Sequence, residues 1–360
     1  MSSIAFVNGS LQTDGIFRAN FQIYQAAKAL GLDSRWIECT DPGTSGGRFE
    51  GGQKVIGRKL PLVVLEQGYN RLWRFPHLLR NLSDDWLFLG DPTFIKVAYG
   101  RSSQRTIVRL NDLLPLSPYS DRRGARWMFR YAIPRLRWAE RIIVYTDYMR
   151  LHLPRVDHLE ARTFVLPPHT EIPEEEARDH VRQSLARIEE NRRLRVIYVA
   201  TDRAYKNIAF FVELAKVLEN DTDPRFDFTL VSKLQPESRR KFGESSRPNL
   251  TVTPYIPNIQ DAYRSSDVLV FPSLAEGFGL PMLEAISYGM PVLANDIDPI
   301  REVVGGGGAL LPTSDPQSWA RQLRSWATPQ GYRSAAEHAL ERARDYSYDR
   351  FLRRVRMIFE

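Results

Sequence analysis

The stretch SSDVLVFPSLAEGFGLPMLEAISYGMPVLAND, residues 265–296, predicts a strand, a tight turn, a helix and a second strand in one run. Its apolar segment 268–271 is typical of a buried strand, and Gly277 and Gly279 allow the backbone to turn tightly. Pro281 is compatible with the first position of a helix, where the missing N–H loses no hydrogen bond. Strand, turn and helix in this order are typical of α/β proteins.

The N-terminus of this predicted helix is a candidate anion site. We expect the N–H groups near Gly279, Leu280 and Met282 to point out at the carboxyl end of the strand, where α/β sheets bind ligands. Glu276 and Glu284 flank the turn, and a carboxylate can accept hydrogen bonds from two hydroxyls of a sugar or a ribose. Taken singly, Glu276 is better explained as a solvated loop acid and Glu284 as an acid favoured by the helix dipole. The flanking strand, glycines and proline reverse that preference.

Apolar runs and helical patterns alternate along the whole chain, which predicts an α/β protein with two parallel sheets covered by helices. The first series lies at residues 4–7, 17–30, 62–65, 73–82, 86–89, 106–110 and 141–144. The second lies at residues 196–200, 207–218, 226–231, 250–253, 268–271, 281–287 and 291–294. We therefore predict domains at 1–168 and 195–344, a linker with a polar helix at 169–194, and a helix at 345–360 that returns to the first domain.

The composition is that of an ordinary globular protein, with 360 residues, 43% hydrophobic and 26% charged. A single cysteine, Cys39, excludes an intrachain disulfide and is compatible with a reducing compartment. The first residues do not resemble a signal peptide, and no apolar run approaches the roughly 18 residues of a membrane span. We therefore expect a cytoplasmic protein.

Positive charge is concentrated in residues 101–155, which hold twelve arginines against four acidic residues. Such a segment indicates an anionic acceptor, a membrane surface or nucleic acid, and the alternative is a solvated basic face. A helix expected at 122–141, with a kink at Pro134, carries arginines at helical spacing with Trp127, Tyr131 and Trp138 between them. The arginines are Arg126, Arg130, Arg137 and Arg141. This pattern predicts a peripheral protein on the inner face of a membrane, unless the aromatic residues pack into the core.

The motifs in the second half resemble those of the retaining glycosyltransferases of family 4. That family has the GT-B fold, in which two Rossmann-like domains face each other across a cleft. The matching elements are Ser266-Asp267-Val268, Pro272-Ser273, Glu276–Pro281, Glu284, Gly289–Val292, the segment 300–311 and, upstream, Lys206-Asn207. By this resemblance, residues 1–168 would bind the acceptor and residues 195–344 the nucleotide sugar.

The resemblance also implies roles for individual residues. Glu276 would contact the hydroxyls of the donor sugar and Glu284 the ribose, while Lys206 would neutralise the diphosphate. Arg203 would replace an arginine that the family often has earlier in this loop, so the predicted catalytic residues are Glu276, Lys206 and Arg203. The remaining donor-binding positions would be Gly15, Gly277, Phe278, Gly279 and Leu280.

Asn111 and Asp112 stand where the family commonly has a His-Asp pair, and the resemblance implies that they bind the acceptor. Asparagine can donate to and accept from a sugar hydroxyl, but it cannot take up a proton. A general-base role at position 111 is therefore not expected.

The predicted activity is transfer of a hexose from a UDP- or GDP-sugar to an acceptor hydroxyl with retention, in the biosynthesis of a polysaccharide, a lipid-linked glycan or another glycoconjugate. We expect no cofactor and no metal, because the six histidines and one cysteine form no ligand cluster. Two alternatives are a sugar-nucleotide epimerase of the same fold and a related protein that only binds DNA or a sugar nucleotide. The motif residues Glu276, Glu284 and Lys206 argue against a protein that only binds its ligand. Release of nucleotide only in the presence of acceptor would exclude the epimerase.

Overall fold

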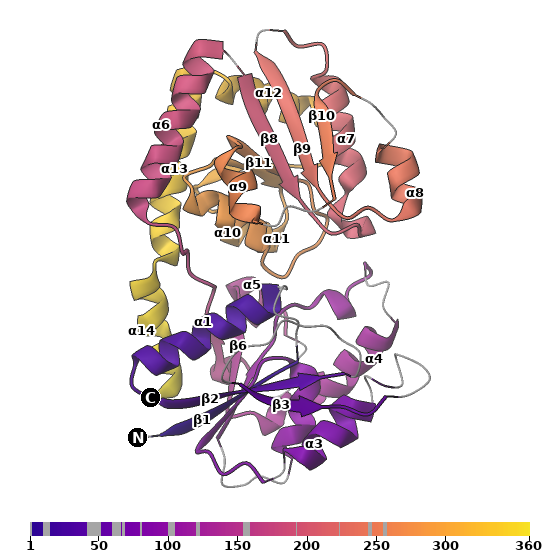
Figure 1. The fold of residues 1–360 in the computed structure, drawn as a ribbon, viewed down its shortest axis with the longest axis vertical. Helices are drawn as coiled ribbons and strands as arrows, with labels where there is room; N and C mark the ends of the chain where they lie inside the picture. The colour runs from indigo at the N-terminus through magenta and orange to yellow at the C-terminus, as the bar shows by residue number, and fades with distance from the viewer. Residues whose placement is uncertain are drawn as a thin grey trace. The chain divides into compact units, whose positions relative to one another are not determined.

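The computed structural model divides into two compact units, one formed by residues 1–169 and 349–360 and the other by residues 170–348 (Figure 1). The structure describes residues 2–9, 15–41, 52–59, 66, 69–79, 81–99, 105–119, 123–153, 159–191, 193–222, 224–243, 247–254 and 258–360. The expected strand at 62–65 and Asp14, which precedes the first helix, lie outside these residues.

In the described part of the first unit, seven strands form one parallel sheet in the order β3-β2-β1-β4-β5-β6-β7. Apolar side chains dominate both faces of the central strands, as expected for a sheet that helices cover on both sides. The strands are β1 (Ser3–Asn8), β2 (Asp33–Thr40), β3 (Gln53–Ile56), β4 (Trp86–Leu89), β5 (Arg105–Arg109), β6 (Arg141–Val144) and β7 (Thr163–Val165).

Helices and short helical turns connect these strands. They are α1 (Gly15–Ala29), η1 (Asn70–Arg74), α3 (Phe75–Leu78), η2 (Pro92–Ala98), η3 (Leu114–Leu116), α4 (Arg123–Ala132), η4 (Ile133–Trp138), α5 (Asp147–Leu151) and η5 (Glu160–Arg162). The strands β2 and β3 were not predicted from the sequence. Polar and charged residues interrupt β2, whose burial alternates only weakly, so the pattern of a buried strand is missing.

The second unit repeats this topology, with six described strands in the parallel order β10-β9-β8-β11-β12-β13. The strands are β8 (Arg193–Val199), β9 (Arg225–Val231), β10 (Leu250–Thr253), β11 (Val268–Phe271), β12 (Val292–Asn295) and β13 (Gly308–Leu311). The helices and turns are α6 (Glu174–Asn191), η6 (Ala204–Lys206), α7 (Ile208–Val217), α8 (Pro236–Ser238), η7 (Arg239–Gly243), α9 (Ile259–Arg264), α10 (Leu280–Ser287), α11 (Asp298–Val304), α12 (Pro316–Trp326), α13 (Pro329–Ala343) and η8 (Arg344–Tyr346). The predicted fold of two Rossmann-like domains is therefore confirmed.

The last helix, α14 (Tyr348–Phe359), packs on the first unit, as predicted from its amphipathic pattern. Phe351, Val355, Ile358 and Phe359 lie in one hydrophobic cluster with residues of β1, α1 and β4. The Phe359 ring lies 6.3 Å from that of Phe6. In Figure 1, α14 lies beside α1 at the end of the chain.

The arginine-rich helix expected at 122–141 is interrupted near Pro134, where a kink was predicted, but it does not continue to Arg141. The α-helix α4 ends at Ala132, and the tighter turn η4 follows, because Pro134 cannot donate the N–H that a continuing helix needs. Arg141 lies in β6, where its guanidinium donates to the carbonyl of Ile358 and stacks over the Trp86 ring at 4.9 Å. Arg141 therefore belongs to the contact with α14, whereas Arg126 and Arg130 remain on α4.

A buried histidine joins α6 to the rest of the second unit. His180 is 4% exposed, and its Nδ1 and Nε2 lie 3.0 Å and 2.8 Å from the carbonyls of Tyr288 and Ser266. A neutral imidazole carries only one N–H and so donates to one of the two carbonyls. Burial is the largest influence and lowers the pKa of His180, although the two carbonyls and Asp267 oppose it.

We predict that His180 makes the protein less stable in weak acid. Because the folded pKa lies below the unfolded value of about 6.5, the unfolded chain binds the proton more readily, and stability falls as the pH drops through this range. The loss amounts to about 1.4 kcal/mol for each unit by which the pKa is lowered. Urea titrations at about pH 7.5 and about pH 5 should show a smaller pH-dependent loss for His180→Gln than for the wild type. Equal losses would show that His180 does not titrate differently in the two states.

Candidate functional site

The candidate site lies where the strand order of the second sheet reverses. From β8 the chain continues outward to β9 and β10, whereas β11, β12 and β13 extend to the other side. The loops 200–207 and 272–279 leave the carboxyl ends of β8 and β11, which are paired neighbours. Loops that diverge in this way leave a crevice between them, which is the usual ligand position in open α/β sheets.

Lys206 and Glu276 meet at this point. Lys206 Nζ lies 2.5 Å from Glu276 Oε1, and the two side chains are only 12% and 6% exposed. The ammonium group also lies 5.4 Å from the centre of the Phe271 ring. A nearly buried carboxylate and a nearly buried ammonium group each require an opposite charge, and here each neutralises the other. The structure thus brings together two of the three residues predicted to be catalytic.

Hydrogen bonds to backbone carbonyls hold the two loops together around this ion pair. Leu274 N–H donates to the carbonyl of Tyr205 at 2.7 Å, and Asn207 Nδ2 donates to the carbonyl of Pro272 at 3.3 Å. Asn207 adopts φ 52° and ψ 43°, a left-handed conformation that asparagine tolerates better than most residues. The left-handed residue ends η6 and begins α7, so Lys206 is presented immediately before a helix.

Tyr198 supports the same loops from inside the sheet. Its hydroxyl donates to the carbonyl of Lys206 at 2.5 Å and lies 3.2 Å from Ser273 Oγ. Burial raises the pKa of this phenol well above its usual value, so the hydroxyl keeps its proton and remains a donor. Sequence inspection did not identify Tyr198, because a tyrosine inside an apolar strand looks like an ordinary core residue.

Gly279 forms the sharp turn into α10. It adopts φ 87°, and a Cβ at this position would collide with Met282 Cε. The helix begins at Leu280, so Pro281 is its second residue and not its first. One expectation is corrected: the Met282 N–H is not free, because it donates to the carbonyl of Gly279 at 2.9 Å. The N–H groups of Gly279 and Leu280 precede the first helical turn, where no helical acceptor is available.

Glu284 lies in α10 and is held by a second buried phenol. The Tyr263 hydroxyl donates to Glu284 Oε2 at 2.7 Å, and Tyr263 is only 1% exposed. This bond fixes one carboxylate oxygen of a partly buried residue. No sequence signal indicated Tyr263, since it lies in a short helix 21 residues before Glu284.

The other residues predicted around this turn occupy less defined positions. Arg203 is partly buried, and its carbonyl accepts the N–H of Lys206 at 2.9 Å. Gly277 and Phe278 are buried, and the Phe278 ring lies 6.1 Å from the ring of Tyr346. The roles of Arg203, Gly277 and Phe278 remain predictions.

The residues predicted in the first unit have structural partners. Gly15 is the first residue of α1. Asn111 is 6% exposed; its Nδ2 donates to the carbonyl of Gly90 at 3.0 Å, and the Tyr145 hydroxyl lies 3.4 Å from its Oδ1. Asp112 accepts the N–H of Leu114 at 3.0 Å. Acceptor binding by Asn111 and Asp112 stays a prediction, and these contacts show that both residues also shape the carboxyl end of β5.

A buried arginine that sequence inspection overlooked completes this polar group. Arg109, on β5, is 1% exposed, lies 4.4 Å from the Tyr145 ring centre, and donates to Asn20 Oδ1 at 3.3 Å. Asn20 in turn donates to Asn8 Oδ1 and to the carbonyl of Gly90, at 2.9 Å and 3.1 Å. Desolvation lowers the pKa of Arg109. The carboxyl edge of the first sheet is thus lined by amides and one guanidinium.

Acidic residues elsewhere in the second unit are engaged by arginines. The triplet Asp-Ile-Asp at 296–298 has both carboxylates paired with Arg301 at 2.5 Å. Asp221, in a similar triplet at 221–223, pairs with Arg324 at 2.7 Å. Among the described residues, no group of three His, Cys, Asp or Glu side chains is placed to hold a metal ion.

Comparison with known proteins agrees with the site geometry. Residues 193–328 match the family described as glycosyl transferases group 1. This match contains the Lys206 loop, the Glu276 turn and Glu284. The matched residues all lie within the second unit.

A similar protein with an assigned function is the serotype-specific mannosyltransferase WbdA of Escherichia coli. It is 30% identical over 162 residues, which are 42% of this chain and 20% of that protein. The chain thus spans about a fifth of the length of this relative.

Solved structures resemble the whole chain. Sucrose-phosphate synthase from Thermosynechococcus elongatus superposes with a TM-score of 0.75 at 16% identity, covering 100% of this chain and 98% of that one. Anabaena HepE in complex with UDP and glucose gives a TM-score of 0.75 at 14% identity, covering 100% and 99%. These likenesses show that the chain has the GT-B fold.

We predict that Lys206 and Glu276 are energetically coupled. Lys206→Met alone leaves a nearly buried carboxylate unpaired, and Glu276→Gln alone leaves a nearly buried ammonium group, so each should lower the free energy of unfolding by about 3 kcal/mol. The double variant should lose much less than the sum of the two. Chemical denaturation of all four proteins measures this coupling. Strictly additive losses would mean that the ion pair does not persist in solution.

Proposed function

We propose that the protein is a glycosyltransferase that moves a hexose from a UDP- or GDP-sugar to an acceptor hydroxyl with retention of anomeric configuration. The observation that carries the proposal is the Lys206–Glu276 ion pair at the strand-order reversal, beside the turn at Gly279. The group 1 glycosyltransferase match over residues 193–328 supports it. Two similar proteins, a mannosyltransferase and a protein whose structure contains UDP and glucose, favour a hexose donor.

In the proposed reaction the acceptor oxygen attacks the anomeric carbon while the bond to the diphosphate breaks. The acceptor proton passes to the departing phosphate on the same face of the sugar, which gives retention. Negative charge accumulates on the diphosphate, and Lys206, the N–H groups of Gly279 and Leu280, and Arg203 would stabilise it.

To bind at this site, the donor would have to break the ion pair between Lys206 and Glu276. A diphosphate at the turn would compete with Glu276 for the ammonium group of Lys206, whose present partner is Glu276 Oε1. Once Lys206 turns to the diphosphate, Glu276 can accept hydrogen bonds from hydroxyls of the donor sugar. The buried pair would thus open only for a ligand that brings both a strong anion and hydroxyl donors. Glu284, positioned by the hydrogen bond from Tyr263, would contact the ribose.

No cofactor and no metal ion enter this proposal. The lysine and the backbone N–H groups would supply the positive charge that a divalent ion supplies in other transferases. The acceptor is proposed to be a glycan, a lipid-linked glycan or another anionic acceptor, with Asn111 and Asp112 contributing to its binding. Nucleic acid is the less favoured partner.

Turnover should depend on the ion pair more than on any exposed charge. With UDP-glucose or GDP-mannose as donor, Glu276→Gln and Lys206→Met should each reduce kcat roughly 100-fold or more, because each removes a group that acts at the reacting centre. Glu284→Gln should instead raise the donor KM about tenfold. Exposed residues of the same unit offer matched controls, Glu337→Gln and Arg321→Met, which should retain full turnover.

The product of this assay also tests the chemistry. Nuclear magnetic resonance should find the new linkage with the anomeric configuration of the donor, and nucleoside diphosphate should be released only when acceptor is present. Release without acceptor, or an epimerised sugar nucleotide, would support an epimerase. Near wild-type turnover in Glu276→Gln, Lys206→Met and Glu284→Gln would contradict the assignment of the site.

Chelation should leave the activity unchanged. We expect initial rates in excess EDTA to equal those with added magnesium or manganese, because the proposed diphosphate site uses Lys206 and backbone donors. Both rates, with EDTA and with the added divalent ion, should be measured on protein dialysed against chelator and with a sugar nucleotide checked to be unhydrolysed. Activity that disappears on chelation and returns with a divalent ion would indicate a different transfer mechanism.

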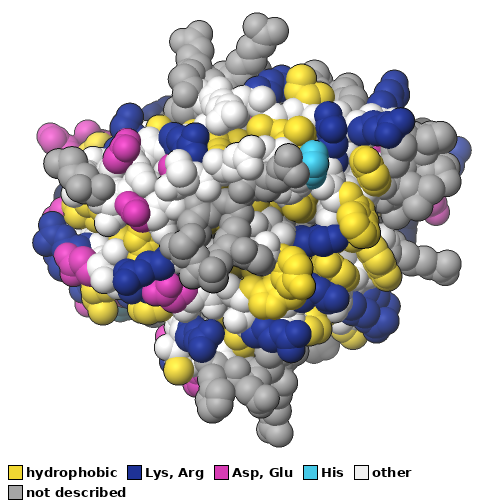
Figure 2. All heavy atoms as spheres, turned by 90° about the horizontal axis from the view of Figure 1, so that it is seen from below, with side chains coloured by type: hydrophobic (Ala, Val, Ile, Leu, Met, Phe, Trp, Pro, Cys, Tyr) yellow, Lys and Arg dark blue, Asp and Glu magenta, His cyan; other side chains and the backbone are white. Residues whose placement is uncertain are grey.

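We further propose that α4 and η4 meet an anionic membrane surface. Trp127 is 56% exposed and lies 6.2 Å from the Tyr131 ring, and Arg130 and Arg137 are exposed nearby in sequence. An exposed indole beside arginines is typical of a helix that lies at a membrane interface. The exposure of Trp127 argues against the alternative that all the aromatic residues pack into the core. Figure 2 shows a face on which hydrophobic side chains lie among lysines and arginines. Within the described part of the chain, no helix has the length and apolar character of a membrane span.

Liposome co-sedimentation tests this surface. Vesicles with phosphatidylglycerol should bind the protein at low salt and release it as salt rises, because adsorbed charge is screened over about 10 Å at 0.1 M. The triple variant with Arg126→Ala, Arg130→Ala and Arg137→Ala should bind weakly. A control with Lys216→Ala, Arg321→Ala and Arg333→Ala removes the same charge from the other unit and should bind normally. Equal sedimentation with neutral and anionic vesicles would contradict the proposal.

A further inference from the structure

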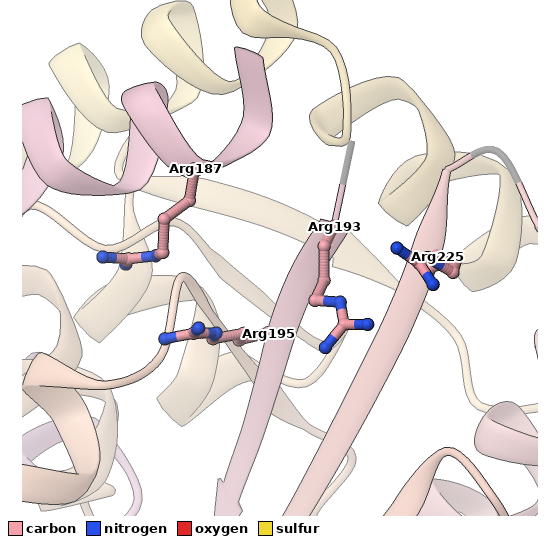
Figure 3. A pocket seen from close by; sticks show the side chains of 4 residues that line it. All are labelled: Arg187, Arg193, Arg195 and Arg225. Atoms are coloured by element: carbon pink, nitrogen blue, oxygen red, sulfur yellow. The ribbon is translucent and has the colours of Figure 1, made fainter. Parts of the chain in front are cut away.

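Four arginines line a pocket at the opposite, amino-terminal end of β8 and β9. This arginine pocket consists of Arg187 from α6, Arg193 and Arg195 from β8, and Arg225 from β9 (Figure 3). Its volume is about 220 Å³. Arg193 stands six residues before Val199, at which the strand enters the Lys206 loop, so the two sites lie about 20 Å apart along the strand.

The register of the sheet explains why the arginines gather here. Arg193 pairs in register with Arg225, and Arg195 pairs with Asp227, so alternate residues of both strands project from the same face. The residues between them, Leu194 and Phe226, are buried on the other face. Figure 3 shows the guanidinium groups of Arg193 and Arg225 turned toward each other. Like charges at neighbouring positions of two strands repel, which makes this end of the sheet a place where an anion is stabilising.

The carboxylates of the protein balance only half of this charge. Arg187 Nη2 lies 2.5 Å from Asp267 Oδ1, and Arg193 Nη1 lies 3.0 Å from Asp227 Oδ2. In the part of the chain that the structure describes, neither Arg195 nor Arg225 has an ion pair. Among these described residues, the guanidinium group of Arg195 reaches only the carbonyl of Ser265, at 3.5 Å.

One donor in the pocket wall is also unsatisfied. Arg187 Nε is buried and has no hydrogen-bond partner among the described residues. A buried N–H without an acceptor costs free energy, which an anion or an ordered water in the pocket can recover. Together with the unpaired Arg195 and Arg225, this donor indicates a ligand that carries several acceptor oxygens and more than one negative charge.

We propose that the arginine pocket binds a multiply charged phosphate anion of the pyrophosphate class. Guanidinium groups bind phosphate oxygens through paired, charge-assisted hydrogen bonds, and the pocket offers two guanidinium groups that are not committed to carboxylates. Its volume admits a small anion and not a sugar nucleotide, which needs a larger cleft. The pocket is separate from the Lys206–Glu276 site, and the inference does not depend on the proposed glycosyl transfer.

Calorimetric titration of the full chain with sodium pyrophosphate tests the site. We expect a binding component that Arg225→Gln weakens roughly tenfold, because one charge-assisted contact is lost. This component should be absent from the double variant with Arg193→Gln and Arg225→Gln. Among the described residues Arg225 has no ion pair to lose, so the single variant should keep the fold, which circular dichroism can verify. The control Arg321→Gln removes an exposed arginine of the same unit and should bind as the wild type does.

Two further titrations separate this pocket from other sources of binding. Lys206→Met should remove any binding at the proposed diphosphate site and leave the Arg225-dependent binding unchanged. Sodium sulfate should bind to the arginine pocket at least tenfold more weakly than pyrophosphate. Loss of binding in Lys206→Met together with normal binding in Arg225→Gln would place pyrophosphate at the other site and overturn the proposal. Equal affinity for sulfate, or no binding to the wild type at millimolar pyrophosphate, would also overturn it.

Discussion

The ion pair between Lys206 and Glu276 is the contact on which the organisation of the second unit's ligand edge depends. It joins the loops that follow two neighbouring parallel strands, and both partners are nearly withdrawn from water. Leaving either charge buried without its partner would cost free energy. Hydrogen bonds donated by Tyr198, Asn207 and Leu274 hold the two loops in the arrangement that keeps the charges together. A ligand that separates the pair must therefore offer an anion to Lys206 and hydrogen-bond donors to Glu276.

The two sheets have the same strand order but place different chemistry at the point of reversal. In the second unit this point carries a charged pair, whereas in the first it carries the amides of Asn8, Asn20 and Asn111 around the buried Arg109. Amides both donate and accept, so they can bind neutral hydroxyls without changing protonation. This difference agrees with one unit holding an anionic donor and the other a hydroxyl-bearing acceptor, as proposed above.

The sequence predicted those parts of the site whose conformation depends on neighbouring residues in the chain. Gly279 and the strand before it were predictable because a left-handed turn requires glycine and a buried strand requires apolar residues. The contact of Tyr263 with Glu284 and the register of Arg193 with Arg225 were not, because they depend on how distant segments meet. The helix expected at 122–141 extended too far because the periodicity of its arginines continued past Pro134 into a strand.

The position of α14 has a consequence for the order of folding. Residues 170–348 form a continuous unit, whereas the other unit needs Phe351, Val355 and Ile358 to fill the cluster around Phe6. During vectorial synthesis on a ribosome, the amino-terminal sheet therefore emerges first but keeps part of its apolar surface uncovered until the last of these side chains appears. Residues 170–348 can therefore complete their core before the amino-terminal unit does. Until α14 is synthesised, the amino-terminal half exposes apolar surface that chaperones could bind.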